Sequence, residues 1–179
     1  MPQTGLYEEN RMIREVTGDI LFTRAQVIAH GIAVRERFDH GLALALRERW
    51  PSMARDYRHA QHGRHMVPGE VWSWAGVDND GSTRNIVNML TQDMVGEGPA
   101  AKPGKATVEH VHHALKALAR HLQAIGATSV ALPRLATGVG GLDWAEVKPL
   151  IEQHLAPLGI PVVVYETYRK DVVADEKLH

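Results

Sequence analysis

Three glycines stand close together in the stretch LPRLATGVGGLDW, residues 132–144. Gly138, Gly140 and Gly141 follow an apolar run that predicts a buried strand, and they precede an amphipathic run that predicts a helix. Glycine lets a ligand approach backbone N–H groups, and N–H groups at the start of a helix attract anions, typically phosphate. The stretch therefore predicts either a phosphate site or a tight connector that needs glycine for its geometry alone. It is not a Walker loop, because no Gly-Lys-Ser or Gly-Lys-Thr follows.

Two further short segments carry groups that could contact a nucleotide. Asp19 lies in residues 17–20, directly after the first expected strand, and its carboxylate could accept a hydrogen bond from an adenine amino group. The alternative is an Asx-turn, in which the same carboxylate bonds its own backbone. Residues 38–41 lie between a strand and a helix, which predicts a second anion site.

Histidines and arginines cluster elsewhere in the sequence. Histidines recur within residues 59–65 and within residues 110–113, but no carboxylate or cysteine accompanies them at a recognised zinc spacing. We therefore predict solvated histidines and no metal site. Arginines make residues 47–65 basic, which favours a solvated helix face over a contact with nucleic acid.

The composition bounds the function classes. The chain has 179 residues, of which 44% are hydrophobic and 23% charged, with a net charge of −1. That balance predicts one globular domain and gives no case for bulk nucleic-acid binding. The absence of cysteine excludes disulfides, thiol nucleophiles and cysteine-ligated metal sites. No apolar run reaches 18 residues and the first ten residues are polar, so we expect a cytoplasmic protein without a membrane span.

The elements that must position these groups follow from periodicity and turn residues. The expected strands are residues 12–16, 27–32, 70–77, 85–90, 129–133 and 160–166. The expected helices begin at residues 41 and 51 and cover residues 108–125 and 143–159, with Thr107 and Asp143 as N-caps. Residues 93–106 read as a long loop. Strands and helices alternate, which predicts a mixed or parallel sheet with helices on both faces and ligands at the carboxyl ends of the strands.

Taken in order, these motifs resemble those of macrodomains, the family of ADP-ribose-binding proteins. The segments that carry the resemblance are Val16 to Ile20, Ile28 to His30, Asp39 to Ala43, Asn88 to Gln92, residues 133–144 and Ile160 to Tyr165. The resemblance covers residues 11–168 and implies a three-layer α/β/α macrodomain with a central mixed, mostly parallel sheet. Residues 1–10 would be a flexible lead-in, and residues 169–179 a charged, peripheral tail.

The chain looks most like the branch of the terminal ADP-ribose protein glycohydrolase and the DarG-type DNA ADP-ribosyl glycohydrolases. In that likeness Asp19 and Tyr165 lie at the adenine, and residues 38–41 and 135–141 enclose the pyrophosphate and the distal ribose. The ligand-binding residues implied are Asp19, Ile20, Gly41, Thr91, Gln92, Pro133, Arg134, Leu135, Thr137, Gly138, Val139, Gly140, Gly141 and Tyr165.

The catalytic residues of that branch are replaced here. Its lysine corresponds to Gln92, and the acidic residue that the protein glycohydrolase has in the last glycine loop corresponds to Gly140. Asp39 and His40 remain beside the expected distal ribose as candidate general bases. His30 matches a histidine of the ADP-ribose-1″-phosphate phosphatase branch, against the alternative of a core histidine.

The resemblance implies an ADP-ribosyl glycohydrolase that removes ADP-ribose from DNA or protein by attack of water at C1″. The alternatives are a non-catalytic ADP-ribose-binding module and a phosphatase for ADP-ribose-1″-phosphate. Lys102 and Lys105 could reach the site from the loop, although solvated lysines are favoured. We expect no cofactor and no membrane partner, a monomer, and a toxin partner if the protein is an antitoxin.

Overall fold

The structure is a computed structural model that describes residues 13–178. Its centre is a six-stranded sheet in the order β1-β8-β7-β2-β4-β3, parallel throughout except for β3, which pairs antiparallel with β4. The strands are β1 (Ile13–Gly18), β2 (Val27–Ala33), β3 (Val71–Val77), β4 (Thr83–Gln92), β7 (Val130–Pro133) and β8 (Val162–Tyr168). The expected mixed, mostly parallel sheet is confirmed, and β3 and β4 form an antiparallel hairpin.

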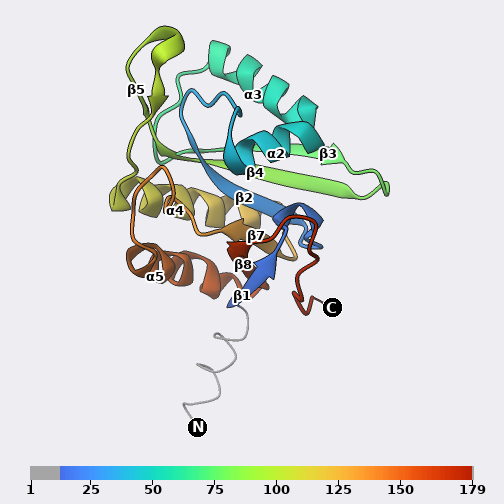
Figure 1. Cartoon of the computed structure of the whole chain (residues 1–179). Helices are drawn as coiled ribbons and strands as arrows, with labels where there is room; N and C mark the ends of the chain where they lie inside the picture. The colour runs from blue at the N-terminus through green and yellow to red at the C-terminus, as the bar shows by residue number, and fades with distance from the viewer. Residues whose placement is uncertain (1–12, 179) are drawn as a thin grey trace.

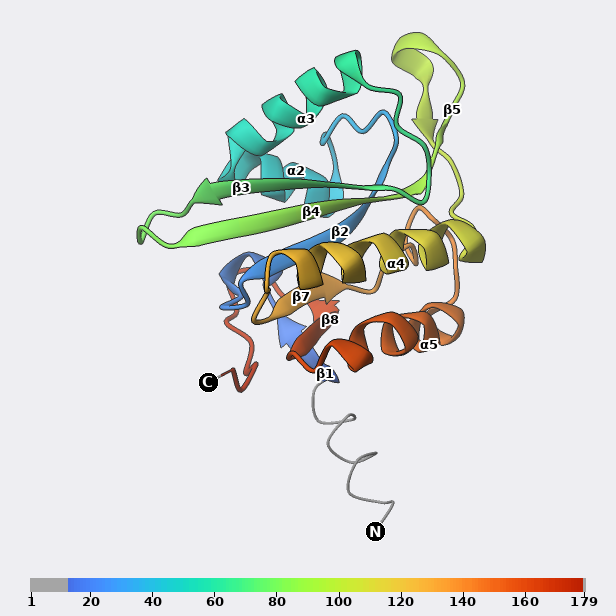
Figure 2. The same cartoon turned by 180° about the vertical axis from the view of Figure 1, so that it is seen from behind.

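Helices cover both faces of this sheet, which makes three layers (Figures 1 and 2). The helices α2 (Gly41–Arg49) and α3 (Pro51–Gly63) lie on one face, and α4 (Val108–Ala124) and α5 (Trp144–Leu155) lie on the other. Single 3-10 turns are η1 (Ile20–Phe22), η2 (Gly98–Ala100) and η3 (Ala156–Leu158). The three-layer α/β/α architecture expected from the sequence is therefore confirmed.

Helix α4 shows how local sequence produces this packing. Leu115, Leu118 and Leu122 recur at helical spacing, and all three are buried against the sheet and α5. The hydroxyl of Thr107 accepts a hydrogen bond from the backbone N–H of His110 at 3.1 Å, which confirms the predicted N-cap. Because the buried stripe is continuous, α4 packs along the sheet and forms part of the hydrophobic core on that side.

The segment 93–106 contains more structure than a loop. It holds a small hairpin of β5 (Met94–Val95) and β6 (Lys102–Pro103), closed by η2. The guanidinium of Arg37 donates to the carbonyl oxygens of Gly98 and Pro99, and the Gln92 amide donates to the Gly104 carbonyl oxygen at 2.7 Å. The expectation of an irregular loop is wrong here, because partners distant in sequence supply these bonds.

The chain after β8 packs on the domain instead of lying at its periphery. The carboxylate of Glu176 is only 8% exposed, and it accepts hydrogen bonds from the Thr23 hydroxyl, the Arg24 backbone N–H and the Tyr165 hydroxyl. A Cβ on Gly18 would lie 2.8 Å from the Val172 carbonyl oxygen, so the tail passes close over the end of β1. The expected peripheral position is therefore wrong for Glu176, whose carboxylate meets three donors, whereas residues 169–173 are exposed as a peripheral tail would be.

The expected cap at Asp143 forms only in part. Asp143 occupies the N-cap position of α5, but its side chain makes no capping hydrogen bond. The lead-in, residues 1–10, lies outside the described residues. Within residues 13–178, no helix combines the length and the apolar composition needed to cross a membrane.

Candidate functional site

Two cavities meet at the carboxyl ends of the central strands. The first, which we call the central cavity, has a volume of about 280 Å³ and lies between the end of β2, the start of α2 and the loop after β7. The second, the apolar cavity, has a volume of about 410 Å³ and lies between η1, α2 and β8. Gly41, Leu42 and Pro133 line both, so the two cavities are neighbours along one path.

Most of the residues predicted for ligand binding line these cavities. Those at the central cavity are Gly41, Gln92, Pro133, Arg134, Leu135, Gly138, Val139 and Gly140, and the catalytic candidates His30 and His40 line it too. Those at the apolar cavity are Ile20, Gly41, Pro133 and Tyr165. Asp19, Thr91, Thr137 and Gly141 line neither cavity.

The glycine loop has one glycine that its own geometry does not require. A Cβ on Gly140 would lie 2.6 Å from the Ala136 carbonyl oxygen, and Gly141 has a φ of 76°, so both positions need glycine for the fold of the loop. A Cβ on Gly138 would meet nothing within 4 Å, yet Gly138 lines the central cavity. A tight connector therefore accounts for Gly140 and Gly141, whereas access to the cavity accounts for Gly138.

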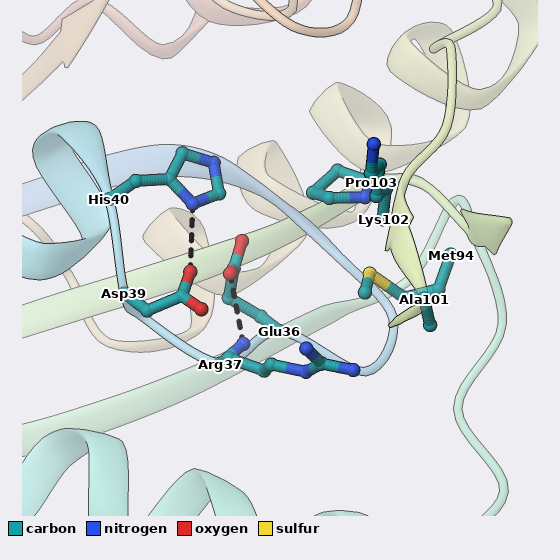
Figure 3. Close-up of a pocket in the computed structure, with 8 residues that line it drawn as sticks. All are labelled: Glu36, Arg37, Asp39, His40, Met94, Ala101, Lys102 and Pro103. Carbon is teal, nitrogen blue, oxygen red and sulfur yellow. Dashed lines mark hydrogen bonds and ion pairs between the residues drawn. The ribbon is translucent and has the colours of Figure 1, made fainter. Parts of the chain in front are cut away.

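Asp39 and His40 form a hydrogen-bonded pair at the mouth of the central cavity (Figure 3). The His40 Nδ1–H donates to the Asp39 carboxylate at 2.8 Å, and the two side chains are 52% and 55% exposed. This hydrogen bond from His40 lowers the pKa of Asp39, so Asp39 is ionised at neutral pH. With Nδ1 as donor, a neutral His40 ring has Nε2 as its acceptor. His40 lines the central cavity, whereas Asp39 lines a smaller neighbouring one of about 190 Å³, which we call the outer cavity.

His30 is buried at the floor of the central cavity and is 2% exposed. Burial lowers its pKa to about 4, so the ring is neutral at physiological pH. Its Nε2–H donates to the Asn88 side-chain oxygen at 2.7 Å, and the Asn88 amide donates to the Trp72 carbonyl oxygen at 3.4 Å. This chain of bonds fixes the ring, so His30 is buried as the core-histidine alternative expects, with a side chain as its partner.

The side chains of Gln92 and Thr91 are engaged in hydrogen bonds that connect β4 to the segment 93–106. The Gln92 amide donates to the Gly104 carbonyl oxygen, and the Thr91 hydroxyl donates to the Gln92 side-chain oxygen at 3.2 Å. Both residues are buried. Lys105 lies against the glycine loop, with its Nζ 3.4 Å from the Val139 carbonyl oxygen, and Lys102 lines the outer cavity.

Asp19 is buried under the C-terminal segment. Its carboxylate accepts hydrogen bonds from the backbone N–H groups of Leu21 and Asp171, each at 3.0 Å. Its own backbone N–H donates to the Val172 carbonyl oxygen at 2.7 Å. The Asx-type bond to Leu21 weighed from the sequence is therefore present, and the next residue, Ile20, lines the apolar cavity.

The sequence reasoning missed several residues that line the cavities. Tyr168 lines the apolar cavity together with Tyr165, and their spacing along one strand end gave a weak signal. Glu36 lines both the central and the outer cavity, yet it stands in the run Arg35-Glu36-Arg37, whose charges read as a solvated turn. No sequence pattern separates a carboxylate that faces a cavity from one that faces solvent.

Metal-ligating side chains do not converge in residues 13–178, where no group of three or more histidines, cysteines, aspartates or glutamates is placed to hold a metal ion. His112 and His154 are a pair, with Nδ1 and Nε2 2.9 Å apart between α4 and α5. This pair lies on the helical layer of α4 and α5, away from the residues that line the cavities.

Comparisons with known proteins give one family. The family model described as "Macro domain" matches residues 37–151. The chain is 28% identical to a DNA ADP-ribosyl glycohydrolase of Thermus aquaticus, over 87% of this chain and 41% of that protein. It is 23% identical to a DNA ADP-ribosyl transferase–DNA ADP-ribosyl glycohydrolase fusion protein of Thermosipho africanus, over 88% of this chain and 42% of that protein. The chain thus spans less than half the length of these two curated relatives.

The solved structures agree with the family match. The macrodomain of Thermus aquaticus DarG superposes with a TM-score of 0.74 at 28% identity, and the match covers 87% of this chain and 98% of that one. The likeness therefore extends over nearly the whole of that solved domain.

Proposed function

This chain belongs to the macro domain family, and we propose that it binds ADP-ribose and hydrolyses the bond that joins ADP-ribose to a macromolecule. The observation that carries the proposal is the continuous path from the apolar cavity to the central cavity, which share Gly41, Leu42 and Pro133. ADP-ribose has an apolar base at one end, an anionic pyrophosphate in the middle and a polar ribose at the other end. The path offers a matching environment for each part.

In this arrangement the adenine occupies the apolar cavity, between Ile20 and the rings of Tyr165 and Tyr168. Asp19, one residue before Ile20, is the proposed acceptor for the adenine amino group. The pyrophosphate lies against the N–H groups at the start of α2 and in the glycine loop, where backbone dipoles favour negative charge. The distal ribose then reaches the part of the central cavity that His40 lines.

The proposed reaction is attack of a water molecule on C1″ of the distal ribose. His40 accepts the proton of that water through Nε2, and Asp39 holds the ring through its bond to Nδ1–H. Asp39 stays ionised because the bond from His40 lowers its pKa. Since Gln92 stands where the branch of the resemblance has lysine, the proposed chemistry does not use a lysine from β4.

The proposed substrate is ADP-ribosylated DNA, with ADP-ribosylated protein as the other macromolecule to test. The name of the Thermus aquaticus relative supports DNA. The Thermosipho africanus relative is named as a fusion with a DNA ADP-ribosyl transferase, which supports a transferase toxin as the partner of this chain. We further propose that the protein works as a monomer in the cytoplasm.

A second candidate function is binding of ADP-ribose without turnover. The contacts of Gln92 favour it, because the amide that replaces the lysine is engaged with the Gly104 carbonyl oxygen and the Thr91 hydroxyl. An amide is neither a general base nor a nucleophile. A phosphatase role is less favoured, because His30 is neutral and already bonded to Asn88.

The test is release of free ADP-ribose from ADP-ribosylated single-stranded DNA and from ADP-ribosylated protein, with calorimetry of ADP-ribose binding alongside. We expect release by the wild-type protein and a loss of rate of about 100-fold or more in His40→Gln, which matches a lost general base. Affinity for ADP-ribose should stay within about threefold, since the ring only borders the cavity. The matched control is His62→Gln, an exposed histidine on α3.

The outcomes separate the candidate functions. Binding of ADP-ribose with no release from any substrate by the wild-type protein would establish the non-catalytic alternative. If His40→Gln and Asp39→Asn release ADP-ribose at the wild-type rate, neither residue takes part in the mechanism. No binding of ADP-ribose at all would contradict both functions and leave the glycine loop as a connector.

A further inference from the structure

We propose that Glu36 is a catalytic residue, whose carboxylate stabilises the positive charge that develops at C1″ of the distal ribose. The inference rests on the proposed hydrolysis and adds a group that neither the sequence motifs nor the relatives assign. Glu36 lines the central cavity together with His40 and Gln92. It also lines the outer cavity, where the bond to the macromolecule would leave the enclosed ribose.

The backbone of the Glu36 turn holds the carboxylate in place. Its Oε2 atom accepts hydrogen bonds from the backbone N–H groups of Arg37 and Phe38, at 2.9 and 3.1 Å. Among the described residues, none donates a hydrogen bond to Oε1. One oxygen therefore anchors the group, and the other is available to a ligand. Phe38 is buried and has a φ of 56°, so the turn that presents Glu36 is itself fixed by the core.

Figure 3 shows where the carboxylate points. It lies between the Asp39–His40 pair on one side and the β6 residues Lys102 and Pro103 on the other. One carboxylate oxygen faces the backbone N–H of Arg37, while the Arg37 guanidinium turns outward to the carbonyl oxygens of η2. Glu36 forms no ion pair with a described residue, although Arg37 and Lys102 line the outer cavity with it.

The other acidic groups around the cavity are less suited to this role. The Asp39 carboxylate already accepts a hydrogen bond from the His40 ring, and of the central and outer cavities Asp39 lines only the outer one. The carboxylate of Asp93 accepts a hydrogen bond from the Met94 backbone N–H and lies on the exposed side of the chain. Glu36 is thus the carboxylate that borders the central cavity.

Chemistry at a glycosidic carbon explains why such a carboxylate matters. The bond between C1″ and the leaving group breaks through a transition state that resembles an oxocarbenium ion, with positive charge on C1″ and the ring oxygen. A fixed negative charge beside that carbon stabilises the transition state more than the neutral ground state. Glycosidases likewise place two acidic side chains beside the bond that breaks.

The step balances with the groups on hand. The oxygen of water forms a bond to C1″, and the bond from C1″ to the acceptor atom of the macromolecule breaks with its electron pair leaving on that atom. His40 Nε2 takes one proton from the water, and the departing atom takes one proton from solvent. His40 then returns its proton to solvent, so water and the ADP-ribosyl linkage give ADP-ribose and the free macromolecule. Glu36 moves no proton in this step.

The substitution Glu36→Gln isolates the charge. The glutamine oxygen can still accept from the N–H groups of Arg37 and Phe38, so the turn keeps its hydrogen bonds. We expect kcat for release of ADP-ribose to fall by about 100-fold or more, the effect of losing one preorganised electrostatic group. The affinity for ADP-ribose should change by less than about threefold, since the product carries no positive charge at C1″.

A second readout does not depend on turnover. An ADP-ribose analogue with a protonated nitrogen in its ribose ring carries the charge of the transition state. The wild-type protein should bind this analogue at least about tenfold more tightly than ADP-ribose, and Glu36→Gln should abolish the preference. Glu97→Gln is the matched control, because Glu97 is an exposed glutamate between β5 and η2 and lines neither the central nor the outer cavity.

The outcomes separate this inference from the proposed function. If the wild-type protein releases ADP-ribose and Glu36→Gln matches it in rate and in analogue preference, Glu36 has no catalytic role and the hydrolase stands. If Glu36→Ala is impaired while Glu36→Gln is not, Glu36 only supports the turn, and the inference fails. If the wild-type protein releases nothing from any substrate, the proposed hydrolysis fails and the catalytic role of Glu36 fails with it.

Discussion

At the scale of single residues, the surroundings of each ionisable group decide its charge. His30 is neutral because burial lowers its pKa, and Asp39 is ionised because the His40 ring donates to it. Glu36 is held by two backbone N–H groups of its own turn. The central cavity therefore combines a neutral imidazole at its floor with a carboxylate and a carboxylate-oriented imidazole at its mouth.

His30 makes the stability of the protein depend on pH. The unfolded chain binds a proton near the usual histidine pKa of about 6.5, whereas the folded protein resists protonation until about pH 4. Stability is therefore full above pH 6.5 and falls as the pH drops toward 4, because the unfolded state binds more protons. We expect His30 alone to cost about 2 kcal/mol of unfolding free energy between pH 7.5 and pH 5. Urea unfolding at the two pH values measures it.

The control for this pH effect is His30→Gln, which keeps a polar side chain but cannot titrate. The loss of stability between the two pH values should be about 2 kcal/mol smaller in this variant than in the wild-type protein. His121 and His154 also have lowered pKa values because of burial, and they contribute equally in both proteins. An identical pH dependence in the two proteins would show that His30 is accessible to protons in the folded state.

At the scale of elements, single polar side chains fix the segments that lack regular structure. Arg37 and Gln92 hold the segment 93–106, and Glu176 holds the chain after β8. Each anchor joins residues that are at least ten positions apart. The walls of both cavities therefore depend on bonds that lie outside the helices and strands.

Arg37 anchors η2, the turn between the two strands β5 and β6 that border the outer cavity. In Arg37→Ala the hydrogen bonds to the Gly98 and Pro99 carbonyl oxygens are lost, and together these bonds contribute about 1–2 kcal/mol to local closure. We expect the backbone amides of residues 94–103 to exchange about tenfold faster with deuterated solvent, while those of α4 are unchanged. Arg35→Ala is the control, since Arg35 is exposed and makes no such bond among the described residues. Equal exchange in both variants would contradict the anchoring role.

Glu176 positions Asp19 through the C-terminal segment. Glu176→Gln replaces a carboxylate that accepts from Thr23, Arg24 and Tyr165 by an amide, whose NH₂ group faces donors. Because the bond from the Asp171 N–H to Asp19 depends on this segment, we expect Asp19 to lose its fixed geometry.

Affinity for two ligands measures this positioning. Asp19 is the proposed acceptor for the adenine amino group, so the wild-type protein should prefer ADP-ribose over the analogue with hypoxanthine as its base. Glu176→Gln should reduce that preference by about fivefold or more, in line with a lost hydrogen bond to a charged group. Asp175→Asn, an exposed change in the same segment, should retain it. A variant that loses affinity for both ligands equally would show a general structural role instead.

At the scale of the whole molecule, the sheet separates two layers of core. One layer joins β-strand side chains to α4 and α5, and the other joins them to α2 and α3. The cavities open at the carboxyl ends of the strands, where the strand-to-helix turns leave the backbone uncovered. The core and the site can therefore be altered separately.

Leu118 tests that separation. It is fully buried in α4, so Leu118→Ala should lower the unfolding free energy by about 2–5 kcal/mol. Affinity for ADP-ribose should change by less than about threefold at a temperature where the variant stays folded. Urea unfolding and calorimetry measure the two quantities. A large loss of affinity in a folded variant would show that the core layer under α4 and the cavities are coupled.

The elements could be predicted because their signals are local. The leucine spacing of α4, the cap at Thr107 and the short apolar runs of β2 and β7 each lie within a few residues of one another. The site was predictable only in part. The glycine loop and residues 38–41 stood out by composition. The positions of Glu36 and Tyr168 at the cavities follow only from the tertiary structure.

The sequence by itself determined the order of strands and helices, the mixed sheet and the chain segments that border the site, because backbone preference and hydrophobic period act over short distances. Only the tertiary structure decided that Glu176 reaches Thr23, that Gln92 bonds Gly104, and that Glu36 faces a cavity. These contacts depend on how distant segments pack and on which side chains burial removes from water. No local pattern of residue types encodes either.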